Sequence, residues 1–300
     1  MVAVALFALS AALAAPPQRI VSTSPSITEI LYALGLGGRV VGVTTFCHYP
    51  PEAAKKPKIG DYIHPNLETI VALRPDLVIA ETTGVRRAER ISGLNLNVLE
   101  VDDGTVAGIL ESIRRIGDAA GAQAAASALT ARIRSELDGI RARAAKLPRP
   151  RVVFVVGRAP GLLEDIVVAG KGSYLDEILA VAGGDNVFRD ARAPYSKITI
   201  EELLARNPDV IIDMGEMART ESVREADRSA VLALWRRYPS LNAVRGGRVY
   251  AVASDIFVVP GPRVVDAARE FEKMLHPELA NLRAKTHSRM PGQTPHRRAL

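Results

Sequence analysis

The chain has 300 residues, a length that suits two domains of about 150 residues each. Hydrophobic residues make up 48% of the sequence, which excludes a disordered chain because substantial cores can form. The net charge is +6, but the basic residues are scattered among acidic ones instead of forming the clustered patch that nucleic-acid binding needs, so we expect no nucleic-acid partner.

The N-terminal segment Met1–Ala14 is apolar and contains Ala12-Leu13-Ala14, which fits an A-x-A cleavage signal. Because a membrane-spanning helix needs about 20 residues, this shorter run predicts a signal peptide over residues 1–15, with a buried first helix as the alternative. No Lys or Arg precedes the run, and no cysteine follows it for lipid attachment. The single Cys47 excludes an internal disulfide framework. We therefore expect a soluble, exported protein. We also expect it to be a monomer.

Residues 18–104 alternate between apolar strands and amphipathic helices, a pattern that predicts an α/β lobe with a parallel sheet. A helix opens either at Ser24 with Pro25 or at Ser26 with Glu29 as a capping box, and it ends at Gly35. The other elements expected here are a strand at Arg19–Ser22, a strand at Val40–Val43, a loop at Thr44–Pro65, a helix and strand within Leu67–Ala80, a further helix, and a strand at Leu96–Val101.

The segment Leu67–Ala80 occurs a second time as Ile200–Asp213. Each copy has a good N-cap residue, ends its helix before a proline, and continues into a short apolar strand. The shared positions are Glu68, Ala72, Pro75 and Asp76 in the first copy, and Glu201, Ala205, Pro208 and Asp209 in the second. Thr28–Gly35 also recurs, as Asp176–Gly183, in the same order. A duplication at this separation predicts two similar lobes and excludes a solenoid, whose repeats are much shorter.

Between the two copies, residues 105–147 are predicted to be helical. Gly121 separates a helix at Thr105–Ala120 from a longer one at Ala122–Leu147, in which apolar residues recur every three or four positions. At 1.5 Å per residue the longer helix would be about 39 Å long, more than one small lobe needs. We interpret it as a rigid strut that joins the lobes; the alternative is a long surface helix of one domain.

Residues 148–275 predict a second α/β lobe, which begins after Pro148-Arg149-Pro150. Its expected elements are a strand at Arg151–Val156, a helix capped by Ser173, a loop at Asn186–Ile198 equivalent to Thr44–Pro65, the second motif copy, a helix at Leu232–Tyr238, a strand at Arg248–Ala253 and a last helix at Val264–Leu275. Residues 276–300 form a polar, basic tail that we expect to be frayed.

Several segments in this order resemble the periplasmic substrate-binding proteins of metal-chelate ABC importers. They are the SPSITEILYALG opening, the VGVTTFCHYPPEA loop, the NLETIVALRPDLVIA motif, the long inter-lobe helix and the closing WRRYPSLNAVRGGRVYAV with GPR. The resemblance covers roughly Gln18 to Leu275 and is closest to the cobalamin-binding branch. It implies a periplasmic protein with two α/β lobes with mainly parallel sheets joined by one long inter-lobe helix, a ligand held between the lobes, and delivery of that ligand to a membrane permease.

The resemblance also implies that each lobe presents one glutamate to arginines of the permease, and by motif position these are Glu68 and Glu201. The alternative is that each is an acidic residue in a first helical turn, which the helix dipole favours by about 0.3–1 kcal/mol. Two such residues at equivalent places would form a two-point clamp, in which the second contact gains from effective concentration.

A large planar chelate is held by aromatic faces and a few polar groups at the carboxyl ends of strands. The candidate ligand-binding residues are Tyr49, Tyr62, Tyr195, Phe257 and Arg263. The alternative for each tyrosine is a loop residue packed on its own lobe, and for Arg263 an ordinary surface arginine. Tyr195 stands where the cobalamin branch tends to carry Trp, and Glu81 also replaces an aromatic residue. Haem and ferric siderophores therefore remain alternatives to cobalamin.

Cys47-His48-Tyr49 is the one place with metal-ligand chemistry, because imidazole or phenolate could coordinate iron. His48 stands in no HxxH or CxxC pattern, so we predict no protein metal site and no prosthetic group. The sequence also lacks GxSxG, P-loop, HExxH and GxGxxG motifs. We therefore predict a binding protein, with an exported α/β enzyme as the weaker alternative.

Overall fold

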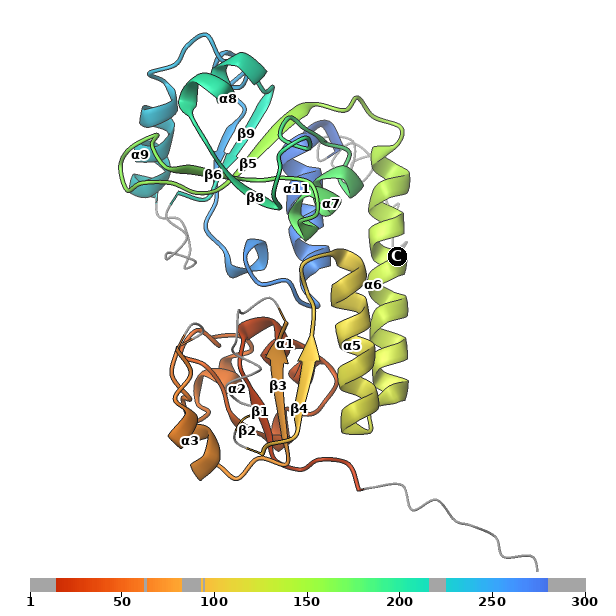
Figure 1. Ribbon diagram of the computed structural model, residues 1–300. Helices are drawn as coiled ribbons and strands as arrows, with labels where there is room; N and C mark the ends of the chain where they lie inside the picture. The colour runs from red at the N-terminus through yellow and green to blue at the C-terminus, as the bar shows by residue number, and fades with distance from the viewer. Residues whose placement is uncertain (1–14, 62–63, 83–92, 94, 216–224, 280–300) are drawn as a thin grey trace, which may run out of the picture. The chain divides into compact units, whose positions relative to one another are not determined.

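The computed structural model describes residues 15–61, 64–82, 93, 95–215 and 225–279 (Figure 1). The predicted signal peptide, Tyr62, the helix expected between residues 82 and 96 and most of the basic tail lie outside these ranges. The described residues form two compact units: one comprises those up to Glu100 together with Arg114–Ala126, and the other comprises Val101–Ile113 together with those from Ser127 onward. Each unit contains an α/β sheet, and we call them the first and the second lobe.

The first lobe contains a four-stranded sheet in the order β2-β1-β3-β4. β1 pairs in parallel with both β2 and β3, as predicted. The strands are β1 (Ile20–Ser22), β2 (Val40–Gly42), β3 (Leu77–Glu81) and β4 (Val98–Val101). The core packed on this sheet contains fully buried Val21, Ile59, Ile70 and Val78. β3 is buried at all five positions, and its first four residues form the continuous apolar run Leu77–Ala80, as expected for a strand covered on both faces.

Helix α1 (Pro25–Ala33) begins at Ser24, whose hydroxyl accepts a hydrogen bond from the backbone N–H of Ile27. The first of the two predicted helix starts is therefore confirmed. The helix is followed by its C-cap Leu34 and then by the predicted stop Gly35, which has a φ of +76° that favours glycine. The other helices of this lobe are η1 (Gly37–Arg39), α2 (Pro51–Ala54) and α3 (Leu67–Ala72). The expected loop at Thr44–Pro65 thus contains a short helix, which the proline-rich sequence obscured.

Helices α5 (Val106–Ala120) and α6 (Gln123–Ala144) follow, separated by Gly121 at a φ of +69°. The division between the two lobes falls within both helices, so each contributes residues to both. α6 has 22 residues, which corresponds to about 33 Å. It ends three residues earlier than predicted. The apolar stripe that predicted the helix is buried: Ala126, Leu129, Ile133, Leu137, Ile140 and Ala144 are all 5% exposed or less.

The second lobe contains a sheet in the order β10-β9-β5-β6-β8, with β7 also paired to β5. Its strands are β5 (Arg151–Gly157), β6 (Ile166–Ala169), β7 (Asp185–Asn186), β8 (Tyr195–Ile198), β9 (Val210–Asp213) and β10 (Val249–Ala251). β5, β7, β9 and β10 are parallel, but β6 pairs antiparallel with both β5 and β8. The mainly parallel fold class is confirmed.

One local prediction for this sheet was wrong, because the expected loop at Asn186–Ile198 ends in strand β8. Two further strands, β6 and β7, were not predicted. β8 reads Tyr-Ser-Lys-Ile, which lacks a clear apolar alternation. Such a strand forms because β6 offers it four backbone partners from Ile166 to Ala169.

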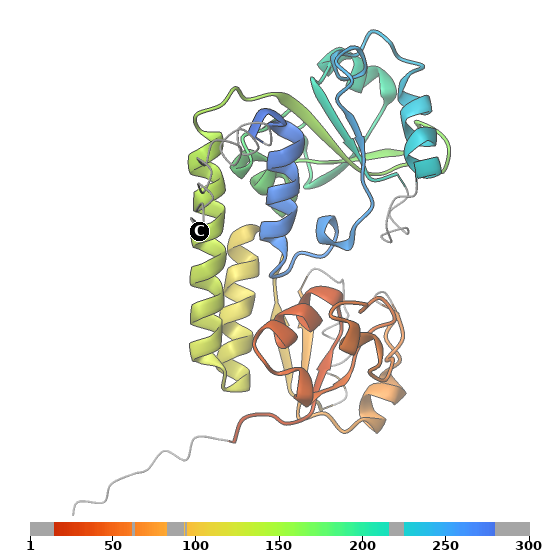
Figure 2. The ribbon, with the colours of Figure 1, turned by 180° about the vertical axis from the view of Figure 1, so that it is seen from behind.

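The helices of the second lobe are α7 (Tyr174–Val181), α8 (Ile200–Arg206), α9 (Glu225–Trp235), α10 (Asn242–Arg245), η2 (Asp255–Phe257) and α11 (Val264–Leu275). α11 has the predicted bounds and lies beside α6 in both views (Figure 2). Arg143 on α6 donates to both carboxylate oxygens of Glu272 on α11, at 2.8 and 2.9 Å. Among the described residues, no helix combines the length and apolar character needed to cross a membrane.

The sequence repeat is also a repeat of contacts. In the first lobe, the Asp76 carboxylate accepts the backbone N–H of Arg19 at 2.9 Å, and the Arg19 guanidinium donates to the Leu73 carbonyl at 2.6 Å. In the second lobe, Asp209 accepts the backbone N–H of Arg151 at 3.2 Å, and Arg151 donates to the Arg206 carbonyl at 2.6 Å. In each lobe the aspartate after the motif's proline therefore fixes the start of the first strand of that lobe, and the arginine there holds the end of the motif helix.

Candidate functional site

The two glutamates predicted to dock on a permease occupy equivalent positions in their own lobes. Glu68 lies in the first turn of α3 and Glu201 in the first turn of α8, and both are exposed. Asn66 caps α3 by accepting the backbone N–H of Thr69 at 3.0 Å, and Thr199 caps α8 by accepting that of Glu202 at 3.2 Å. Both predicted caps are confirmed.

Hydrogen bonds from its own backbone N–H and from the Thr199 hydroxyl lower the pKa of Glu201 below its usual value. This carboxylate is therefore kept charged, as an ion-pair partner must be.

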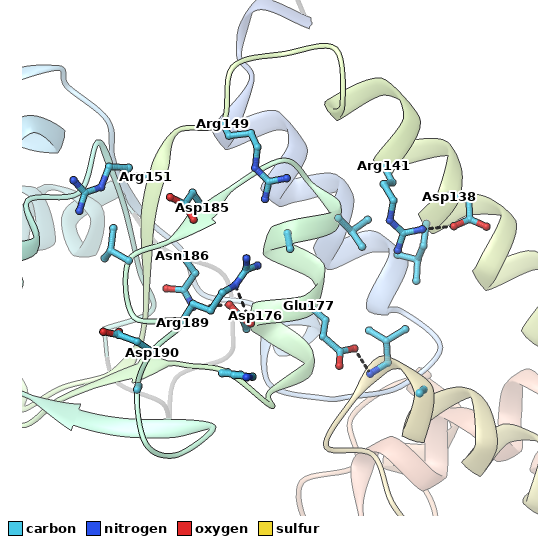
Figure 3. A pocket seen from close by; sticks show the side chains of 18 of the residues that line it. Asp138, Arg141, Arg149, Arg151, Asp176, Glu177, Asp185, Asn186, Arg189 and Asp190 are labelled. Carbon is cyan, nitrogen blue, oxygen red and sulfur yellow. Dashed lines mark hydrogen bonds and ion pairs between the residues drawn. The ribbon is translucent and has the colours of Figure 1, made fainter.

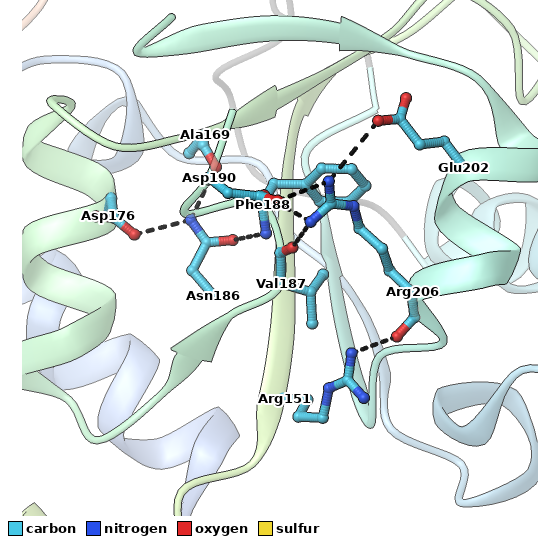
Figure 4. Close-up of polar contacts among 9 residues, drawn as sticks. All are labelled: Arg151, Ala169, Asp176, Asn186, Val187, Phe188, Asp190, Glu202 and Arg206. Atoms are coloured by element: carbon cyan, nitrogen blue, oxygen red, sulfur yellow. Dashed lines mark hydrogen bonds and ion pairs between the residues drawn. The ribbon is translucent and has the colours of Figure 1, made fainter. Parts of the chain in front are cut away.

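Arg206 fixes the other end of α8 (Figure 4). Its guanidinium donates to both carboxylate oxygens of Asp190, at 2.6 and 3.2 Å, and lies 4.5 Å from the centre of the Phe188 ring. These contacts tie the helix to the loop that follows β7. The orientation of Glu201 is therefore set by contacts at both ends of a helix of only seven residues.

At the carboxyl edge of the first lobe's sheet, the loop after β2 presents two aromatic side chains. Tyr49 is 45% exposed, and Phe46, which the sequence reasoning missed, is 56% exposed. Between them Cys47 is fully buried, and its sulfur accepts a hydrogen bond from the Thr28 hydroxyl at 3.1 Å and lies 3.2 Å from that of Thr44. The buried cysteine anchors the loop that carries these two side chains. Phe46 directly precedes Cys47 in a loop that follows a strand, and this position could have identified it.

Glu81 ends β3 at the same edge and is only 4% exposed. The Ser26 hydroxyl donates to its carboxylate at 2.8 Å, and Ser26 lies in the first turn of α1. A carboxylate near a helix N-terminus is favoured by the helix dipole. This residue, which the resemblance marks as a departure from an aromatic position, is thus held inside the first lobe.

At the carboxyl edge of the second lobe's sheet, a buried ion pair follows two neighbouring strands. Arg158 comes directly after β5 and Asp213 ends β9; their side chains are 3% and 0% exposed, with 3.0 Å between Arg158 Nε and Asp213 Oδ2. The indole N–H of Trp235 donates to the same carboxylate oxygen at 2.7 Å, and the backbone N–H of Gly215 donates to the other at 2.7 Å. The sequence reasoning missed this cluster, although a charged residue at the end of a continuous apolar strand is a usable signal.

The sequence suggested that Tyr195 and Phe257 lie in exposed loops, but neither residue does. Tyr195 is the first residue of β8, an edge strand, and is 45% exposed. Phe257 is 3% exposed, with its ring centre 5.2 Å from that of Phe271 and 5.7 Å from that of Phe154. Its aromatic faces are therefore covered by the core of the second lobe, because η2 directs the side chain inward.

Arg263 also has a partner within its own lobe. Its guanidinium donates to both carboxylate oxygens of Asp255, at 2.9 and 2.8 Å, and its side chain is 15% exposed. Such a bidentate pair occupies the geometry that would otherwise bind a ligand carboxylate or phosphate. His48 is exposed, and within the described ranges no three His, Cys, Asp or Glu side chains are grouped so that they could hold a metal ion.

A groove of about 1660 Å³ lies elsewhere on the second lobe, lined by α7, parts of α5 and α6, and the loop after β7 (Figure 3). Some of its charged side chains pair with one another: Arg141 with Asp138, Arg189 with Asp176 at 3.7 Å, and Arg206 with Asp190 at 2.6 Å. The groove includes Arg151, the first residue of β5, so it lies at the amino end of that strand. Ligands of parallel α/β sheets bind at the opposite end, and the groove contains none of the predicted ligand-binding residues.

Three comparisons relate the chain to known proteins. Residues 20–256 match the sequence profile of the periplasmic binding protein family. The uncharacterized ABC transporter substrate-binding lipoprotein YvrC of Bacillus subtilis is 32% identical over 270 residues, which cover 87% of this chain and 81% of the relative.

Two solved structures are also similar. The periplasmic vitamin B12 binding protein BtuF of Vibrio cholerae has 27% identity and a TM-score of 0.73, over 89% of this chain and 98% of that one. The periplasmic heme-binding protein RhuT of Roseiflexus sp. RS-1 has 27% identity and a TM-score of 0.70, over 86% of this chain and 99% of that one.

Proposed function

Because the chain belongs to the periplasmic binding protein family, we propose that it captures a metal chelate and delivers it to the permease of an ABC importer. The observation that carries this proposal is the pair of exposed glutamates, Glu68 and Glu201, in equivalent, capped first helical turns of two similar lobes. A carboxylate at each position suits charge-assisted hydrogen bonds to arginine. Two such contacts on one binding protein would strengthen each other by effective concentration.

The ligand that we propose is cobalamin or a related corrinoid. Support comes from the similar vitamin B12 binding protein of Vibrio cholerae, and from the exposed aromatic side chains of Phe46 and Tyr49. Aromatic rings contribute large apolar contact areas and suit the face of a planar macrocycle. In a substrate-binding protein of an importer, such a ligand would be transported cargo and not a resident cofactor.

Haem is the second candidate, favoured by the similar heme-binding protein of Roseiflexus and by the exposed His48 and Tyr49 side chains, which have iron-binding chemistry. A ferric siderophore is the third candidate of the same architecture. Titration of the purified protein with cyanocobalamin, haemin and a ferric hydroxamate siderophore, followed by absorbance, separates these ligands. Saturable one-to-one binding of one of them without chemical change supports the proposal, whereas turnover to a new product would favour an enzyme.

Docking is tested with the double variant Glu68→Gln/Glu201→Gln. We expect the ligand affinity to stay within about twofold of wild type, and ligand uptake by cells with the matching importer to fall at least about tenfold, since two charge-assisted contacts are lost. The matched control is Glu52→Gln/Glu202→Gln, which removes one exposed first-turn carboxylate from the same two lobes and should leave uptake unchanged. Loss of ligand binding in the Glu68/Glu201 variant, or unchanged uptake, would contradict the docking role.

A further inference from the structure

The Arg158 side chain does more than pair with Asp213. Its Nε donates to the Asp213 carboxylate at 3.0 Å, while Nη1 donates to the carbonyl of Leu162 at 3.0 Å and lies 3.3 Å from that of Ala159. One buried guanidinium thus joins the end of β9 to the loop that follows β5. We call these contacts the Arg158 clasp.

The loop Ala159–Glu164 has its own turn structure, Leu163 packs it against the core of the second lobe, and the clasp adds a polar attachment at Leu162. The backbone N–H of Leu162 donates to the Ala159 carbonyl at 3.1 Å, and that of Ala159 to the Glu164 carbonyl at 2.9 Å. These bonds close the loop on itself. The bond from Arg158 Nη1 to Leu162 fixes the loop tip to β9 through Asp213.

Leu162 at the tip of this loop is 45% exposed, although leucine side chains are more often buried. It lies on a loop at the carboxyl end of β5, the end of a parallel sheet at which ligands bind. Because Asp213 neutralises Arg158, the clasp presents no net charge to a ligand. The loop therefore offers an apolar contact on a fixed support.

We propose that Arg158 is a positioning residue for ligand binding, which acts by holding Leu162 against the apolar face or edge of the transported macrocycle. This inference rests on the proposed function and adds a residue of the second lobe to it. A loop fixed before binding loses less conformational freedom when the ligand arrives, so the clasp increases affinity without touching the ligand.

Arg158→Lys separates positioning from folding. Lysine keeps the positive charge beside Asp213, but a single ammonium group cannot reproduce the planar fork that spans the carboxylate and the loop carbonyl. Trp235 is the only tryptophan in the chain, so its indole N–H gives one resonance in a nitrogen-15 NMR spectrum and reports on the bond to Asp213. We expect Arg158→Lys to leave this resonance nearly unchanged and to weaken binding of cyanocobalamin or haemin by about tenfold, and we expect Leu162→Ala to weaken it similarly.

The matched control is Arg143→Lys, which makes the same substitution in another arginine–carboxylate pair of the second lobe, between α6 and α11. It should lower stability without changing affinity. Wild-type affinity in both Arg158→Lys and Leu162→Ala would overturn the inference, as would an equal loss of affinity in Arg143→Lys. If the wild-type protein binds neither cyanocobalamin, haemin nor the siderophore, the proposed function fails, and the clasp's role in binding fails with it. If the wild-type protein binds a ligand and both variants bind it equally well, the clasp's role fails while the proposed function stands.

Discussion

Gly35 and Gly183 end equivalent helices in the two lobes, and substitution by alanine should affect them unequally. Both have positive φ, +76° at Gly35 and +86° at Gly183. At Gly35 an added Cβ would meet nothing within 4 Å, whereas at Gly183 it would come 2.7 Å from His276 Nε2 and 2.9 Å from the Ala144 side chain. Both alanine substitutions therefore carry the free-energy cost of a left-handed backbone, and only Gly183→Ala adds a steric clash.

The backbone cost of alanine in a left-handed conformation is about 1–2 kcal/mol. Overpacking at Gly183 adds about 1–3 kcal/mol, because the His276 ring is held by a hydrogen bond to the Ala182 carbonyl at 3.0 Å and is 1% exposed. We therefore expect Gly183→Ala to lower the free energy of unfolding of the second lobe by about 3 kcal/mol and Gly35→Ala to lower that of the first by about 1 kcal/mol. With a urea slope of about 2 kcal/mol per M, the midpoints should fall by about 1.5 and 0.5 M.

Each lobe has a natural reporter for this measurement. Trp235 is the only tryptophan and lies buried in the second lobe, so its fluorescence follows unfolding there. Cys47 is the only cysteine and lies buried in the first lobe, so its labelling by a thiol reagent at each urea concentration follows unfolding there. Equal midpoint shifts in the two variants, or a larger shift for Gly35→Ala, would refute the reasoning from steric contact.

Two further predictions concern the helix cap and the buried thiol. Thr199→Ala removes one of the two hydrogen bonds that lower the pKa of Glu201, so this pKa should rise toward its usual value in a carboxyl carbon-13 NMR titration. Because the folded-state pKa of Glu201 is depressed, its contribution to the stability of the fold is present at neutral pH and is lost as the pH falls through that pKa. Thr199→Ala should therefore reduce this loss of stability in acid. An unchanged pKa of Glu201 in Thr199→Ala would contradict the assigned cause. Thr28→Val removes the hydroxyl that donates to Cys47, so labelling of Cys47 by N-ethylmaleimide in the native protein, followed by mass spectrometry, should accelerate about fivefold. Thr28→Ser, which keeps the hydroxyl, should label more slowly than Thr28→Val, and equal rates would contradict the hydrogen bond's role.

The sequence determined the elements whose cause is local. A cap residue such as Ser24, Asn66 or Thr199 satisfies backbone N–H groups two or three positions away, so it can be recognised from neighbouring residues. The duplication predicted two lobes, and the continuous apolar run of β3 predicted a strand buried on both faces. The helix stripe on α6 likewise predicted its buried face.

The tertiary structure decided which polar groups meet. Arg158 and Asp213 are 55 residues apart in the sequence, and Trp235 is a further 22 residues along. Arg263 is likewise paired by the fold, with Asp255, and Phe257 is turned into the core. An exposed arginine and a buried one have the same local sequence signals, because burial and pairing depend on strand order and on the side chains that neighbouring strands bring together. Strand β8 shows the same limit, since its four residues pair only because β6 lies beside them.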